Sequence, residues 1–168
     1  YLQSYPFYCV SIAVMHKNSI EHAVIYDPLR HETFAASRGA GARMNNHRIR
    51  VSNKTKLADS VLSLQLPVRK AEYIEEHINW YKHAATEWSG IRCSGSAALD
   101  LAYVAAGRYD AFWEFNLKTW DIAAGALLVK EAGGYVGNIN KNENYLYTGN
   151  IYACNNNLLD ELESGFIT

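Results

Sequence analysis

The stretch that decides the fold runs from Gly95 to Gly134 and reads GSAALDLAYVAAGRYDAFWEFNLKTWDIAAGALLVKEAGG. Its two ends, Ser96–Ala106 and Thr119–Ala132, are rich in alanine and leucine and predict helices. Between them, Tyr109–Phe115 is rich in aromatic residues and predicts a strand. A helix, a strand and a helix in direct succession indicate layered α/β packing.

Strands and helices continue to alternate around this stretch. The sequence predicts strands over Val61–Leu66, Ile91–Cys93, Tyr135–Asn138 and Ile151–Cys154, and helices over Lys70–Ala85 and Leu158–Glu163. Residues 1–55 differ, because strands follow one another across polar or glycine turns: Phe7–Val14, Ile20–Tyr26, His31–Ala36 and His47–Ser52. We therefore expect an antiparallel part over residues 1–66 and an α/β part over residues 67–168, with a boundary near Leu66-Pro67.

The composition of the 168 residues is that of a folding domain. Hydrophobic residues make up 49% and charged residues 20%, so the chain can bury enough apolar surface to offset its entropy. The formal net charge of −1, without runs of like charge, argues against nucleic-acid binding. No apolar run reaches the roughly 18 residues of a membrane span, and no signal peptide is visible. With Cys9, Cys93 and Cys154 interpreted as reduced core thiols, we expect a cytoplasmic protein without membrane contact.

The turn of Gly95, Ser96 and Ala97 is a first candidate site. It leads from a strand into a helix, and the free N–H groups of a helix N-terminus attract anions. The simpler interpretation is structural: Ser96 is the N-cap and the alanines allow close packing. Spacing alone favours the structural interpretation over a substrate pocket.

Two acids are further candidates. Glu114 lies near the end of a strand between Trp113 and Phe115, where burying a carboxylate is costly. It is either an exposed polar position or a hydroxyl-binding group at a strand's carboxyl end. Asp121 stands in the first turn of a helix that Thr119 can cap, where it either stabilises the helix dipole or offers an oxygen to Mg²⁺. The six histidines lack metal-ligand spacing, and no GxSxG, P-loop or GxGxxG motif is present.

Longer motifs indicate a family. The segment WDIAAGALLVKEAGG carries the pattern WDxAAGxLLVxEAGG nearly in full. Upstream, VIYDPLRHETFAASRGAGARMNNHRIRVS has the strands, glycine-rich hairpin and basic ending of the same family. Over essentially its whole length the chain resembles the inositol monophosphatase family, and GSAALDLAYVAAGR is most similar to its bacterial, SuhB-like branch.

This resemblance implies an αβαβα sugar-phosphatase fold, like that of fructose-1,6-bisphosphatase. It also implies a lithium-sensitive, usually homodimeric hydrolase that uses two or three Mg²⁺ ions to release phosphate from inositol 1-phosphate. By position, Asp121 matches a metal ligand, and Glu114 matches an acid that hydrogen-bonds an inositol hydroxyl. Gly95, Ser96 and Ala97 match the turn that borders the substrate ring.

The chain also departs from the family pattern. The DPxDGTxN motif, which carries two metal-binding aspartates, and an upstream glutamate are not in this sequence, which starts at Tyr1. We therefore expect an N-terminally incomplete fold with no complete catalytic set. Asp121 alone cannot build a two-metal site, so the 168-residue chain by itself is expected to be inert.

Two other functions stay open. The WD motif is shared with bisphosphate nucleotidases and sugar bisphosphatases, so a different phosphate ester is one alternative. SuhB-like proteins are associated with transcription complexes and RNA processing, so a protein partner is the other. Arg92, just before the GSAALD turn, is a candidate contact for such a partner, although a solvated surface arginine is the simpler interpretation.

Overall fold

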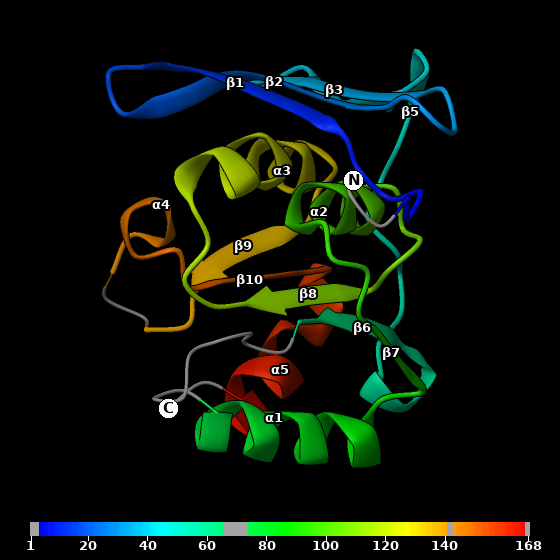
Figure 1. Ribbon diagram of the computed structural model, residues 1–168, viewed down its shortest axis with the longest axis vertical. Helices are drawn as coiled ribbons and strands as arrows, with labels where there is room; N and C mark the ends of the chain where they lie inside the picture. Colours follow the sequence, from blue (N-terminus) through cyan, green and yellow to red (C-terminus); the bar gives the residue numbers. More distant parts are fainter. Residues whose placement is uncertain (1–3, 66–73, 141–142, 167–168) are drawn as a thin grey trace.

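The computed structural model describes residues 4–65, 74–140 and 143–166. Figure 1 shows four layers: a first sheet at the top, helices α2 (Ala97–Ala105) and α3 (Thr119–Glu131), a second sheet, and helices α1 (Ile74–Glu87) and α5 (Leu159–Phe166). The layered α/β prediction is confirmed, and the four layers follow the β, α, β, α part of the αβαβα order. The expected boundary at Leu66-Pro67 and the predicted helix start at Lys70 lie outside the described residues.

The first sheet is the predicted antiparallel meander. Its strands follow chain order: β1 (Val10–His16), β2 (Ser19–Asp27), β3 (Glu32–Ser37), β4 (Gly41–Met44) and β5 (His47–Arg48). Strand β4 was not predicted, because Gly41, whose φ is 80°, closes a turn and also begins the strand. The predicted strand His47–Ser52 is too long, and β1 begins at Val10 instead of Phe7.

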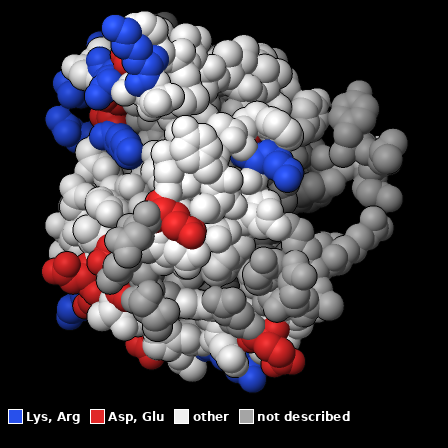
Figure 2. All heavy atoms as spheres, turned by 90° about the vertical axis from the view of Figure 1, so that its left-hand side faces the viewer, with Lys and Arg blue, Asp and Glu red and all other residues white. Residues whose placement is uncertain are grey.

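The two faces of this sheet differ. Ile25 and Phe34 point towards the helices and are fully buried. On the outer face, β1 and β2 expose Ile12 opposite Val24, while Arg43 lies opposite Arg48 on β4 and β5. The outer face therefore changes from apolar at the β1 edge to basic at the β5 edge. Figure 2, which views the molecule from one side, shows basic side chains gathered at the level of this sheet.

The second sheet has the order β7-β6-β8-β10-β9. Its strands are β6 (Val61–Leu64), β7 (Gly90–Arg92), β8 (Ala111–Glu114), β9 (Tyr135–Asn138) and β10 (Ile151–Cys154). Strand β6 pairs in parallel with β7 and β8, and β10 pairs antiparallel with β8 and β9. The predicted strands Tyr135–Asn138 and Ile151–Cys154 are confirmed, whereas the short helix α4 (Tyr145–Thr148) was not predicted.

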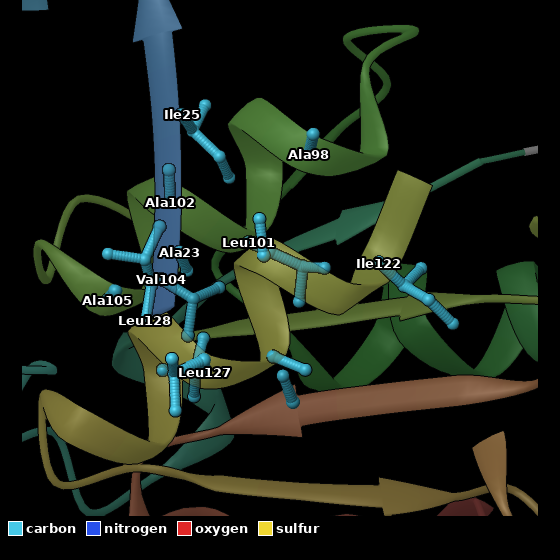
Figure 3. Close-up of a cluster of buried hydrophobic side chains, with 14 of the residues drawn as sticks. Ala23, Ile25, Ala98, Leu101, Ala102, Val104, Ala105, Ile122, Leu127 and Leu128 are labelled. Carbon is cyan, nitrogen blue, oxygen red and sulfur yellow. The ribbon is translucent and has the colours of Figure 1, made fainter. Parts of the chain in front are cut away.

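Helices α2 and α3 fill the space between the sheets (Figure 3). They approach closely at Gly125, where a Cβ atom would stand 2.4 Å from Cβ of Leu101. At its other end, α3 holds the β3–β4 hairpin: the Glu131 carboxylate accepts the N–H groups of Gly39 and Gly41 at 2.8 and 2.7 Å. Helix α3 is thus packed between the sheets and also anchors the hairpin of the first one.

The cysteines correct one expectation. All three are free thiols, and Cys154 is buried, but Cys9 is only half-buried and Cys93 is exposed. Cys93 follows the end of β7 at the surface, between the polar residues Arg92 and Ser94, and is therefore not part of the core. Of the helices in the described ranges, none has the length and apolar character needed to cross a membrane.

Candidate functional site

The candidate residues lie where the second sheet meets the starts of α2 and α3. Glu114 ends β8, and Asp121 stands in the first turn of α3, which follows β8. Gly95 and Ser96 lead from β7 into α2, which begins at Ala97. In α/β sheets the carboxyl ends of parallel strands are the usual ligand site, and this edge gathers all five predicted residues.

Glu114 has the most unusual environment. It follows Phe112 by two residues on the sheet face that packs against α2 and α3. Its Oε2 atom is buried and has no hydrogen-bond partner among the described residues. Burial, followed by the charges of Asp100 and Asp121, raises the pKa of Glu114 from 4.5 to about 8. Below that pH the carboxyl is neutral, so it can both donate and accept a hydrogen bond.

Asp121 combines a structural contact with a free oxygen. Its Oδ2 accepts the backbone N–H of Lys118, the N-cap residue, at 3.0 Å. The prediction that Thr119 caps this helix is wrong, because Thr119 is already helical and its hydroxyl donates to the Leu146 carbonyl oxygen at 2.8 Å. The half-buried Asp121 carboxylate keeps Oδ1, for which no protein hydrogen bond is found within the described ranges.

The turn before α2 is open on its outer side. Ser96 is the N-cap residue, as predicted, but its side chain makes no capping bond; its Oγ lies 3.8 Å from Sγ of Cys9 instead. Gly95 has a φ of 89°, and a Cβ atom placed there would meet nothing within 4 Å. Backbone of this kind leaves room for a ligand beside the start of α2.

Two supports of the site were missed at the sequence level. Between Glu114 and Asp121 the loop is held by a segment after α4: Leu117 N–H donates to the Gly149 carbonyl oxygen at 3.0 Å. Gly149 is required there, since a Cβ atom would lie 2.1 Å from the Leu117 carbonyl oxygen. The second support is Asp100, which is fully buried in the first turn of α2. The signal for Gly149 was a glycine directly after YLYT. The signal for Asp100 was a lone acid inside an apolar helix.

The acids fit the chemistry of a Mg²⁺ site in part. Carboxylate oxygens are the ligands that Mg²⁺ prefers, and Asp121 offers one at an edge that already holds Asp100 and Glu114. Within the described ranges, no group of three or more histidine, cysteine, aspartate or glutamate side chains is placed to hold a metal ion. Asp121 therefore fits the role of one ligand among several.

The fold is that of a layered α/β protein, and the candidate site lies at the carboxyl ends of parallel strands. The model of the inositol monophosphatase family matches residues 1–165. The chain belongs to this family.

Individual relatives agree with that assignment. The chain is 46% identical over 157 residues to the Nus factor SuhB of Pseudomonas aeruginosa, covering 92% of this chain and 58% of that protein. Among solved structures, the extragenic suppressor protein suhB of Bartonella henselae is 42% identical with a TM-score of 0.93, covering 98% of this chain and 63% of that one. The inositol monophosphatase of Anabaena sp. PCC 7120 is 36% identical with a TM-score of 0.88, covering 98% and 65%. The chain thus spans about three fifths of the length of these relatives.

Proposed function

We propose that the complete protein is a Mg²⁺-dependent phosphomonoesterase that releases phosphate from inositol 1-phosphate. The observation that carries this proposal is the buried, unpartnered Oε2 of Glu114 at the edge where α3 presents Asp121. A buried polar atom without a partner costs free energy, and a ligand hydroxyl placed there would remove that cost. Family membership supplies the reaction class.

The residues of this chain then have separate roles. Asp121 would hold one Mg²⁺ through its free oxygen, with the remaining ligands coming from elsewhere in the complete protein. Metal ions bound this way neutralise phosphate charge and activate water. Glu114 binds a ring hydroxyl, and Gly95, Ser96 and Ala97 border the ring. We expect the 168-residue chain not to catalyse the reaction by itself, because one carboxylate does not make a two-metal site.

Phosphate release by the whole gene product tests the proposal. We expect release from inositol 1-phosphate in Mg²⁺ and none with a chelator. Asp121→Asn should lower kcat by about 100-fold or more, because it weakens a metal ligand. Asp160→Asn is the matched control, since Asp160 is also an acid in the first turn of a helix but lies exposed on α5. Equal activity of Asp121→Asn and Asp160→Asn would contradict the role of Asp121.

The same assay decides between the candidate substrates. Inositol 1-phosphate, a nucleotide bisphosphate and a sugar bisphosphate are compared by kcat/KM. Preference for either bisphosphate would overturn the choice of substrate in favour of the sister activities. The proposal also includes inhibition by Li⁺, tested by adding lithium chloride to this assay, and a homodimer, tested by light scattering.

A second candidate function is binding to a transcription complex. The curated relatives from Pseudomonas aeruginosa and Escherichia coli K12, both 46% identical, carry the name Nus factor SuhB. Arg92 lies exposed at the end of β7, and its Nη1 donates to the Ile91 carbonyl oxygen at 3.0 Å. We expect Arg92→Ala to weaken capture of the cognate RNA polymerase complex while Asp121→Asn leaves it intact. Unchanged capture by Arg92→Ala would remove Arg92 from this role.

A further inference from the structure

Asp100 is a buried acid that neither the metal role nor the hydroxyl-binding role uses. It stands in the first turn of α2 and is 0% exposed. Its Oδ2 accepts a hydrogen bond from the Ser63 hydroxyl at 2.8 Å. The Ser94 hydroxyl lies 2.6 Å from both carboxylate oxygens. Strand β6, which carries Ser63, and the turn before α2, which carries Ser94, are thus tied to one carboxylate.

An acid is a costly choice for this position. Burial raises the pKa of Asp100, while the hydrogen bonds from Ser94 and Ser63 act in the opposite direction. Its neighbours on α2, Leu99 and Leu101, are fully buried apolar residues, so packing alone would be satisfied by another one. The hydrogen bonds of the carboxylate therefore explain why an acid stands at this position, whereas the packing of the side chain does not.

These contacts fix the turn that runs from Ser94 to Ser96. The Ser94 Oγ also accepts the backbone N–H of Ser96 at 3.3 Å. From the end of β6, the amide oxygen of Gln65, in the orientation that satisfies its neighbours, accepts the N–H groups of Gly95 at 2.6 Å and Ser94 at 3.0 Å. The turn has open space at Gly95 on one side and is held by Asp100, Ser94 and Gln65 on the other.

We propose that Asp100 is a positioning residue that, through the Ser94 hydroxyl, sets the Ser94–Ser96 turn against which the substrate ring binds. The part that concerns substrate rests on the proposed phosphatase function. The Ser63 hydroxyl also donates a hydrogen bond to the Asp100 carboxylate, but Ser63 lies in strand β6, outside the turn. Removing the Ser94 hydroxyl should therefore disturb ligand binding, whereas removing the Ser63 hydroxyl should not.

The test compares Ser94→Ala with Ser63→Ala in the whole gene product. Each variant removes one hydroxyl that binds Asp100, so the pair is matched in chemistry. We expect Ser94→Ala to raise KM for inositol 1-phosphate about tenfold with a smaller change in kcat, and Ser63→Ala to leave KM within about twofold. Equal changes of KM in both variants would overturn the proposal, because they would show a general structural role.

A second readout is independent of activity. Cys93 is exposed beside the turn, so the rate at which a disulfide reagent labels it reports how firmly the turn is held. Labelling of the Cys93 peptide, located by mass spectrometry, should be at least about twofold faster in Ser94→Ala than in Ser63→Ala. Identical labelling rates would contradict the positioning role. If no phosphate ester is hydrolysed, the proposed function fails while this comparison still decides whether Asp100 holds the turn.

Discussion

Within the described residues the two sheets have five strands each, but their surroundings differ. The second sheet is covered on both faces, by α2 and α3 on one side and by α1 and α5 on the other (Figure 1). The first sheet packs on α2 and α3 with one face and exposes Val10, Ile12 and Val14 on the other. The candidate site belongs to the fully covered sheet, and the Glu114 side chain lies on its face towards α2 and α3. A sheet that is packed on both faces favours a precise ligand site.

The contact between α2 and α3 should show the largest effect, because the first sheet packs on these helices and the second sheet shares their core. Gly125→Val places a branched side chain where even a Cβ atom meets Leu101 at 2.4 Å. We expect a loss of about 3 kcal/mol in the free energy of unfolding, measured with urea. Lys130→Ala, at an exposed position of the same helix, is the control. A loss no larger than that of the control would show that the helices can move apart.

Two isoleucines on opposite faces of the first sheet allow the stability contributions of the two faces to be compared. Ile25 is 0% exposed and faces the helices, whereas Ile12 is 56% exposed on the outer face. In the 168-residue chain, Ile25→Ala should cost about 2 to 3 kcal/mol in the free energy of unfolding and Ile12→Ala less than about 1 kcal/mol. The same pair in the whole gene product sharpens the comparison, since a cost of Ile12→Ala close to that of Ile25→Ala there would reveal a covered outer face.

The raised pKa of Glu114 predicts a stability that depends on pH. Because its pKa is raised from 4.5 to about 8 in the folded state, the folded protein binds the proton more tightly than the unfolded chain. Stability from this group is therefore complete below pH 4.5 and is lost as the pH rises towards about 8, by at most about 1.4 kcal/mol per pH unit.

Glu114→Gln removes this dependence, so its stability relative to the parent chain should increase from pH 5 to pH 8. Denaturant midpoints at several pH values, without metal or ligand, provide the measurement. A constant difference between the two proteins across this range would mean that Glu114 is already ionised in the fold.

The sequence predicted the regular parts of both sheets and less of what supports the site. Strand β10 was predicted correctly because all four of its residues are buried, which selects an apolar run. Strand β4 was missed because Gly41 is typical of a turn. The hydrogen bond between Ser63 and Asp100 was missed because these residues are 37 positions apart, a separation that local periodicity does not register. Contacts of this kind depend on how the layers meet, which only the folded structure shows.

We propose that this chain contributes substrate-binding groups and one metal ligand to a larger Mg²⁺-dependent phosphatase. The most direct test measures phosphate release from inositol 1-phosphate by the whole gene product and by the 168-residue chain at equal concentration in Mg²⁺. We expect release by the whole gene product and none by the 168-residue chain. Release by the 168-residue chain alone, or none by the whole gene product, would contradict it.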